Sequence, residues 1–248
     1  LYAGEYVNPL YEMPEWNLPG DEFENKYELK PLGLYSFGQP DKLSNMGEHF
    51  RDYYKVCYQA MELPALSGKL MAQPLEPIRV LGEVKPVSVK RLGKSDDYVF
   101  DFGQNFTGVC KLRVKGRKGH KITIEHTELL NKDGTPNMLY LRIAEPNYPY
   151  PMQTDIFFLR GGGKYEELMP RFTYHGFRFA VVRNMPYEPE LSDLTGYQVR
   201  SDVADIGSFN SDSDMLNWMQ EAIMWTERGN LHGIPCLLYT SPSPRDTR

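Results

Sequence analysis

The stretch Val109-Cys110-Lys111-Leu112-Arg113-Val114 alternates between apolar and basic residues. A period of two is typical of a β-strand with one face against a core and the other in water. Cys110, Leu112 and Val114 are therefore expected to point inward, and Lys111 and Arg113 outward. This strand lies at the centre of the most regular part of the chain.

Further short strand patterns flank this stretch on both sides. They cover residues 87–90, 98–101, 121–130, 156–159, 177–182 and 194–201. Asp133-Gly134 and Gly161-Gly162-Gly163 provide turn signals between them. Several short strands separated by turns predict a mainly β fold with an antiparallel β-sandwich.

After residue 201 the apolar period becomes helical. Apolar side chains recur every three or four residues between Met215 and Thr226, Asp212 or Ser213 is placed to cap the N-terminus, and Gly229 is a stop signal. This apolar stripe is too extensive for a helix in water. The pattern therefore predicts a helix that packs against a partner.

Composition bounds the class of protein. The chain has 248 residues, 41% hydrophobic and 25% charged, which fits an ordinary globular chain of one or two domains. The densest basic stretch, residues 111–118, alternates with apolar residues, and the net charge is −5. A solvated strand face explains that stretch, so we expect no nucleic-acid partner. No apolar run is long enough for a bilayer, so we expect no membrane partner either.

The three cysteines, Cys57, Cys110 and Cys236, are too few and too scattered for a disulfide framework or a zinc site. We expect no metal site and no cofactor. The chain starts at Leu1 rather than Met and has no signal-peptide pattern, which leaves the cellular compartment open.

Two runs, Asp101-Phe102-Gly103-Gln104-Asn105 and the stretch of residues 172–178 (Phe-Thr-Tyr-His-Gly-Phe-Arg), carry a resemblance to a known family. Together with residues 125–130, 133–134 and 154–155, they resemble signatures of the bacterial α-L-rhamnosidases (glycoside hydrolase family 78). The resemblance runs from about Tyr2 to Pro235. It implies a parent enzyme that hydrolyses terminal non-reducing α-L-rhamnose with inversion, acting on a rhamnose-containing glycan or glycoside.

The resemblance also implies a domain order. Residues 1–82 would be the C-terminal part of an N-terminal β-sandwich, with Trp16 as one of its residues, although residues 34–58 fit the family pattern poorly. Residues 83–190 would form a complete concanavalin-like antiparallel β-sandwich. Residues 191–235 would supply a linker strand and the first helix of a truncated α/α six-hairpin barrel. Residues 236–248 have the character of a foreign tail.

The resemblance assigns no catalytic residue to this chain. In the family both catalytic carboxylates belong to the barrel, one of them in an Arg-Asp-Glu-Arg run. Arg245-Asp246-Thr247-Arg248 imitates that run, but it lies too late in the sequence and Thr247 replaces the glutamate. We therefore expect the chain alone to be inactive, with the missing barrel as its intramolecular partner.

Four residues are candidates for a buried polar network. His126 and Glu128 share a strand face with apolar residues, and a carboxylate beside an imidazole is one arrangement for proton transfer, with Glu125 as a further member. A structural hydrogen-bond network, in which Glu128 joins Asp155 and Arg178, is the alternative that we favour.

Two neighbouring amides are candidates for substrate binding. The side chains of Gln104 and Asn105 follow a glycine and have the donors and acceptors to bind a sugar hydroxyl, or they cap strand ends. Tyr174-His175-Gly176 resembles a bulge or turn, and no second ligand sits at a spacing from His175 that predicts a metal site. The functions that compete with a rhamnosidase fragment are a non-catalytic carbohydrate-binding module and a structural β-sandwich.

Overall fold

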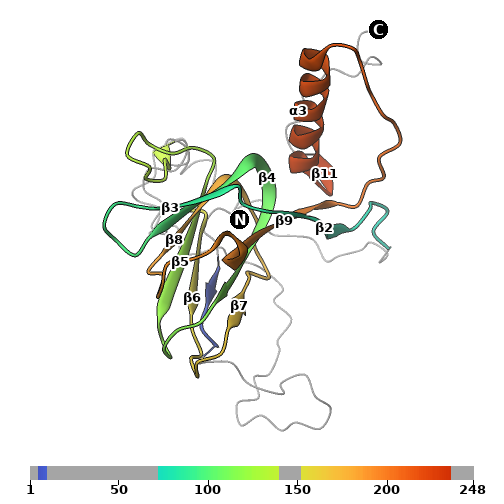
Figure 1. The fold of residues 1–248 in the computed structure, drawn as a ribbon. Helices are drawn as coiled ribbons and strands as arrows, with labels where there is room; N and C mark the ends of the chain where they lie inside the picture. The colour runs from blue at the N-terminus through green and yellow to red at the C-terminus, as the bar shows by residue number, and fades with distance from the viewer. Residues whose placement is uncertain (1–4, 10–71, 140–151, 236–248) are drawn as a thin grey trace, which may run out of the picture. The chain divides into compact units, whose positions relative to one another are not determined.

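The computed structural model describes residues 5–9, 72–139 and 152–235. All of these except residues 72 and 73 belong to one compact unit. This part of the chain is mainly β with one long helix near its C-terminal end (Figure 1), which confirms the predicted fold class. Its elements are β1 (Tyr6–Val7), β2 (Ile78–Val84), β3 (Ser88–Arg91), β4 (Tyr98–Val114), β5 (Lys121–Thr127), β6 (Thr154–Phe158), β7 (Glu166–Leu168), β8 (His175–Arg183), η3 (Leu191–Asp193), β9 (Leu194–Ser201), α3 (Asp214–Asn230), β10 (Leu231–His232) and β11 (Ile234–Pro235).

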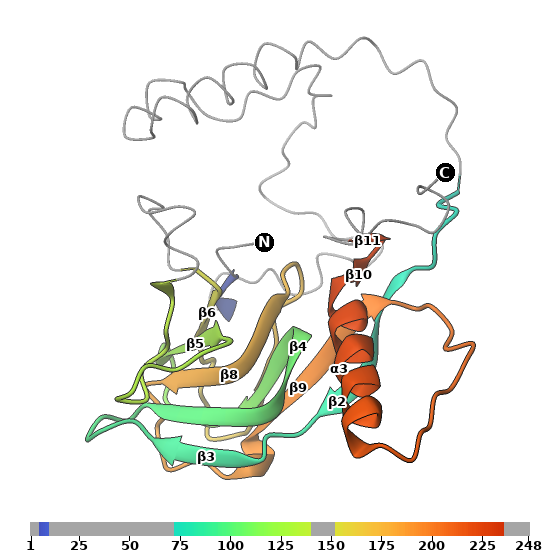
Figure 2. The same cartoon turned by 90° about the horizontal axis from the view of Figure 1, so that it is seen from above.

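Nine of the described strands form a single sheet. Its order is β1-β6-β5-β8-β4-β9-β2, and β3 and β7 also pair with β4. The pairs are antiparallel except β1 with β6, which is parallel. The long strand β4 curves between β8 and β9 (Figure 2). It thereby connects the strands on its two sides into one curled sheet.

Strand β4 corrects one expectation. The sequence predicted separate strands at residues 98–101 and 109–114 with a loop between them, but residues 98–114 form one strand. Its register with β8 shifts between Asp101, opposite Phe179, and Phe106, opposite Phe177. Residues 102–105 therefore form a bulge within the strand and do not separate it into two strands joined by a loop. The predicted alternation beyond the bulge is confirmed, because Cys110, Leu112 and Val114 are buried.

Aromatic side chains fill the core below this bulge. The rings of Phe102, Phe106 and Phe177 lie 4.5–5.6 Å apart between centroids, in tilted or edge-to-face contact. Burial of such large apolar surfaces is the main source of stability in a curled sheet. Close approach of β4 and β9 adds a steric requirement. A Cβ atom at Gly108 would lie 1.9 Å from the carbonyl oxygen of Tyr197, so only glycine fits there.

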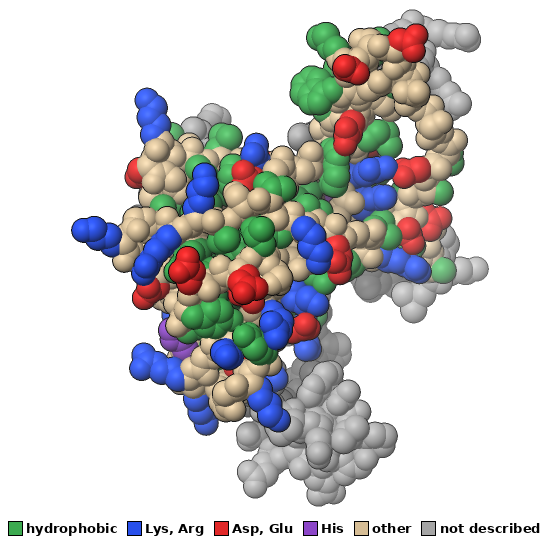
Figure 3. Space-filling view, viewed as in Figure 1, with side chains coloured by type: hydrophobic (Ala, Val, Ile, Leu, Met, Phe, Trp, Pro, Cys, Tyr) green, Lys and Arg blue, Asp and Glu red, His purple; other side chains and the backbone are tan. Residues whose placement is uncertain are grey.

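The predicted helix is confirmed as α3. Its N-cap is Ser213, without a side-chain capping hydrogen bond, and it runs through Gly229 to Asn230 rather than stopping at the glycine. Trp225 packs against the core of the sheet, whereas several large apolar side chains of α3 remain exposed, as the cluster of green atoms in Figure 3 shows. These are Met215, Leu216, Trp218, Met219 and Ile223.

The strands at the two ends of the predicted N-terminal domain both join this sheet. β1 pairs with β6, and β2 pairs with β9. The domain boundaries at residues 82 and 190 stay predictions. Trp16, residues 34–58 and the proposed tail at residues 236–248 lie outside the described part of the chain. Within the described ranges, no helix combines the length and apolar character that a bilayer span requires.

Candidate functional site

Three polar side chains meet inside the sheet, on the neighbouring strands β6, β5 and β8. His126, Asp155 and His175 are 0%, 0% and 2% exposed. His175 Nε2 lies 3.1 and 3.2 Å from the two carboxylate oxygens of Asp155, and the two imidazole rings stack with centroids 4.2 Å apart. Because a carboxylate only accepts, Nε2 of His175 is the donor.

Electrostatics keep His126 neutral. Burial and the neighbouring His175 lower the pKa of His126 to about 3. Its Nδ1 donates to the Gln153 carbonyl at 3.1 Å, and its Nε2 has no partner among the described residues. Burial opposes ionisation of Asp155, but the hydrogen bond from His175 and the nearby imidazoles outweigh it and hold the pKa of Asp155 below its ordinary value. The cluster is thus one carboxylate that accepts hydrogen bonds beside a neutral imidazole.

The same three residues have the chemistry of metal ligands. One ligand atom from each lies within 4.8 Å of the others. Sequence spacing did not predict this grouping, because the three residues come from three different strands. However, the imidazole planes are only 21° from parallel, so their in-plane lone pairs do not converge on one point. Zinc at about 2.0–2.1 Å from each nitrogen needs such convergence, and this stacked arrangement does not fit it.

The cluster also ties the N-terminal segment at Glu5 to the sheet. Asp155 Oδ1 accepts the backbone N–H of Glu5 at 2.8 Å. The Glu5 carboxylate in turn accepts the N–H groups of Arg171 and Phe172, each at 2.8 Å. Tyr174-His175-Gly176 was expected as a bulge or turn, but His175 and Gly176 begin strand β8. The run from residue 172 to 178 is thus bound by the carboxylates of Glu5 at Phe172 and of Asp155 at His175, which indicates a structural role.

Arg178 and Glu128 do not join this cluster. Arg178 makes a two-pronged ion pair with Asp101 at 2.8 and 2.9 Å. That hydrogen bond lowers the pKa of Asp101 and raises the pKa of Arg178. Glu128 follows the end of β5, is exposed, and accepts a hydrogen bond from Asn105 Nδ2 at 3.1 Å. Of the four predicted network residues, the structure brings only His126 and Asp155 together.

The alternative proton-transfer group is not assembled either. The carboxylate of Glu125 binds Arg183 Nε and Nη2, at 2.7 Å each. It points to the opposite face of β5 from the buried His126, as the alternation of a strand requires. Neither Glu125 nor Glu128 hydrogen-bonds the imidazole, so we assign no acid–base role to this set.

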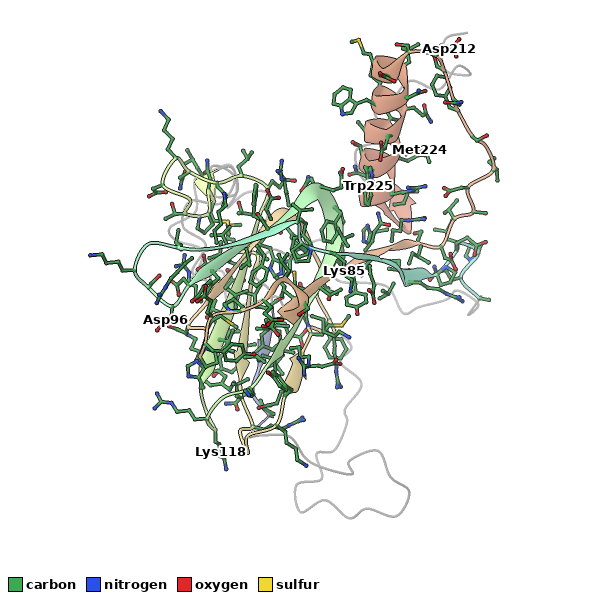
Figure 4. The ribbon with its side chains drawn as sticks, viewed as in Figure 1. Lys85, Asp96, Lys118, Asp212, Met224 and Trp225 are labelled. Carbon is green, nitrogen blue, oxygen red and sulfur yellow. The ribbon has the colours of Figure 1, made fainter. Side chains whose placement is uncertain are left out.

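The predicted sugar-binding amides line a groove. Gln104 and Asn105 lie in the bulge of β4, where Gln104 Nε2 donates to the Asn105 carbonyl at 2.7 Å. The groove has a volume of about 590 Å³ and runs between this bulge and helix α3. Trp218, Glu221 and Trp225 line its other side. Figure 4 shows α3 with Trp225 at the end nearest the sheet and Asp212 at the far end.

Comparisons with known proteins identify the family of this domain. The family model for the bacterial α-L-rhamnosidase concanavalin-like domain matches residues 91–200. An α-L-rhamnosidase of Streptomyces avermitilis is 34% identical over 180 residues, which are 73% of this chain and 16% of that protein. Residues 91–200 are a bacterial α-L-rhamnosidase concanavalin-like domain.

Solved rhamnosidase structures share the fold. The α-L-rhamnosidase from Dictyoglumus thermophilum superposes with a TM-score of 0.69 at 30% identity, over 95% of this chain and 22% of that one. The Streptomyces avermitilis enzyme complexed with L-rhamnose gives 0.62 at 32% identity, over 71% and 16%. The chain therefore spans only about a fifth of the length of the rhamnosidases it matches.

The matched residues locate the rhamnosidase signatures in the structure. The bulge of β4, the ion pair of Asp101 with Arg178 and the buried histidine–aspartate cluster all fall within residues 91–200. Helix α3 lies beyond the matched range. In this rhamnosidase domain the two sequence signatures are thus linked physically, because Asp101 belongs to the first and Arg178 to the second.

Proposed function

We propose that this chain is the accessory β part and first barrel helix of a longer α-L-rhamnosidase, which hydrolyses terminal non-reducing α-linked L-rhamnose with inversion. The match of residues 91–200 to the rhamnosidase domain carries this proposal. Rhamnosidases act on rhamnose-containing substrates, and one of the similar structures holds L-rhamnose. A rhamnose-containing glycan or glycoside is the substrate class that we assign to the longer protein.

The chemistry supports a catalytic site outside the described residues. Inverting glycosidases need two carboxyl groups roughly 6.5–9.5 Å apart with room for a water and a sugar ring between them. Asp101, Glu125 and Asp155 are each engaged by a cation or an imidazole of the same sheet. These carboxylates are thus bound to partners within the sheet. The chain alone is therefore inactive in this proposal.

The exposed stripe of α3 supports the proposed domain order. A helix with Leu216, Met219 and Ile223 exposed needs a further surface to cover it. In the proposed arrangement residues 1–82, 83–190 and 191–235 are the end of one sandwich, the concanavalin-like domain, and the linker with the first barrel helix. The remaining barrel helices cover the stripe, and residues 236–248 are foreign to the enzyme.

The proposal is tested on the longer protein. Its incubation with an aryl α-L-rhamnoside, followed by NMR, reports both hydrolysis and the configuration of the sugar released. The proposal predicts β-L-rhamnose as the first product. Release of the α-anomer first overturns the inverting assignment, and hydrolysis of a different glycoside in preference to the rhamnoside overturns the substrate class.

A further inference from the structure

Helix α3 presents two different apolar faces. Trp218, Ala222, Trp225 and Gly229 recur every three or four residues and line the groove beside the β4 bulge. The exposed residues Leu216, Met219 and Ile223 share another face. At 3.6 residues per turn, this second face lies about a third of a turn round the helix. A partner that covers Leu216, Met219 and Ile223 therefore leaves the groove-facing side of the helix uncovered.

The C-terminal end of α3 is fixed against the sheet. Thr107 Oγ1 donates to the Gly229 carbonyl at 2.8 Å. A Cβ atom at Gly229 would lie 3.2 Å from the same Thr107 oxygen, so the absence of a side chain permits this close approach. Trp225, one turn earlier, is partly buried against the core, and Trp218, two turns further, is 67% exposed. The groove is thus closed at Gly229 and accessible at Trp218.

The lining of the groove combines aromatic faces with hydrogen-bonding groups. Trp218 and Trp225 provide two indoles on the helix side. Asn105 and Glu128 lie on the sheet side and are held by their mutual hydrogen bond. Glu221, which lies between the two tryptophans in the sequence, also lines the groove. It makes no hydrogen bond or ion pair with any described residue.

This combination of groups favours a sugar as the ligand. A sugar ring has an apolar C–H face that packs on an indole and a rim of hydroxyls that donate to carboxylates and amide oxygens. The volume of about 590 Å³ lies within the range of small-ligand sites and suits one or two sugar rings. Among the described residues, two carboxylates line the groove and no lysine, arginine or histidine does. An anionic sugar would meet like charges there, so an uncharged sugar fits the groove better than an acidic one.

We propose that the groove between the β4 bulge and α3 binds a neutral sugar ring, with Trp218 as the stacking platform and Glu221 as the acceptor for its hydroxyls. Asn105 and Glu128 complete the contact from the sheet. This binding site lies between strand β4 and helix α3 and requires no catalytic step. A lack of sugar binding in this groove would therefore not contradict the proposed hydrolytic function, and a lack of hydrolysis would not contradict the binding site.

The test is calorimetric titration of the 248-residue chain with the methyl glycosides of L-rhamnose, D-glucose and D-galactose, and with D-galacturonate. The proposal predicts saturable binding of at least one neutral glycoside and none of galacturonate. Trp218→Ala and Glu221→Gln should each weaken that binding by roughly tenfold, which is typical for a central contact in a small site. Both side chains are exposed, so the melting temperature should stay unchanged.

Phe172→Ala is the matched control. Phe172 is an aromatic side chain with 93% exposure that does not line the groove, so its removal should leave sugar binding intact. Lack of saturable binding by every neutral glycoside overturns the proposal. Binding that survives Trp218→Ala, or that Phe172→Ala abolishes, overturns it equally, because the sugar then sits elsewhere.

Discussion

Acidification should destabilise the folded chain through His126. The imidazole is fully buried, and its pKa is lowered from 6.5 to about 3 by burial and by the neighbouring His175. The unfolded chain takes up a proton at this position as the pH falls below 6.5, whereas the folded chain stays neutral. The stabilising contribution is therefore fully present above pH 6.5 and is lost progressively as the pH falls toward 3.

The magnitude follows from the pKa difference. Each pH unit within this window changes the free energy of unfolding by about 1.4 kcal/mol, so acidification from pH 7 to pH 5 should cost roughly 2 kcal/mol. The lowered pKa of Asp155 acts only below its ordinary value of 3.8, outside this range. Burial lowers the pKa of His232 as well, and its contribution has the same sign.

Urea denaturation at pH 7 and at pH 5 measures this loss, with His126→Gln as the comparison. The glutamine lowers stability at both pH values but does not titrate. The difference between pH 7 and pH 5 should therefore shrink by most of the 2 kcal/mol in the variant. An equal loss in the wild-type chain and in His126→Gln would refute the reasoning, because the titrating group would then lie elsewhere.

Three further predictions concern the fold. Arg178→Ala removes the ion pair with Asp101 and should lower the free energy of unfolding by about 1 kcal/mol, since the pair is only partly buried; no change in urea denaturation would contradict this. Gly108→Ala places a methyl group 1.9 Å from a carbonyl oxygen of β9 and should cost about 3 kcal/mol or more in thermal melts. Gly82→Ala, with nothing within 4 Å of its Cβ, should cost much less. The exposed stripe of α3 should make the chain self-associate in sedimentation, and Ile223→Lys should reduce it; a wild-type monomer would argue against the unpartnered stripe.

Periodicity alone predicted much of the fold. The helical spacing between Met215 and Thr226 located α3, and residues 194–201 match β9 at both ends. The alternation at residues 109–114 predicted which side chains of β4 are buried. These patterns are local, because each depends only on which face of an element meets the core.

The continuity of β4 was not predictable in the same way. Gly103-Gln104-Asn105 has the composition of a loop, and composition favours a break there. The strand continues because the flanking Phe102 and Phe106 both bury their rings beside Phe177. Tertiary packing therefore overrode the local turn preference, and four residues are accommodated as a bulge.

The histidine–aspartate cluster could be predicted only in part from the sequence. His126 shares a face with the inward isoleucines of β5, and Asp155 and His175 each lie two residues before a buried phenylalanine of their own strand. That alternation is a signal that all three point inward. Their meeting depends on β5 lying between β6 and β8, which is a property of sheet order. The pairing of Arg178 with Asp101 likewise depends on the register of β8 with β4.

The most direct test of the central claim compares rhamnosidase activity in the 248-residue chain and in the longer protein, using an aryl α-L-rhamnoside at equal molar concentrations. The account predicts hydrolysis by the longer protein and none by the chain alone, because it proposes that the catalytic carboxylates belong to the barrel that this chain lacks. Hydrolysis by the 248-residue chain would contradict the account, since it would place the catalytic groups within residues 1–248.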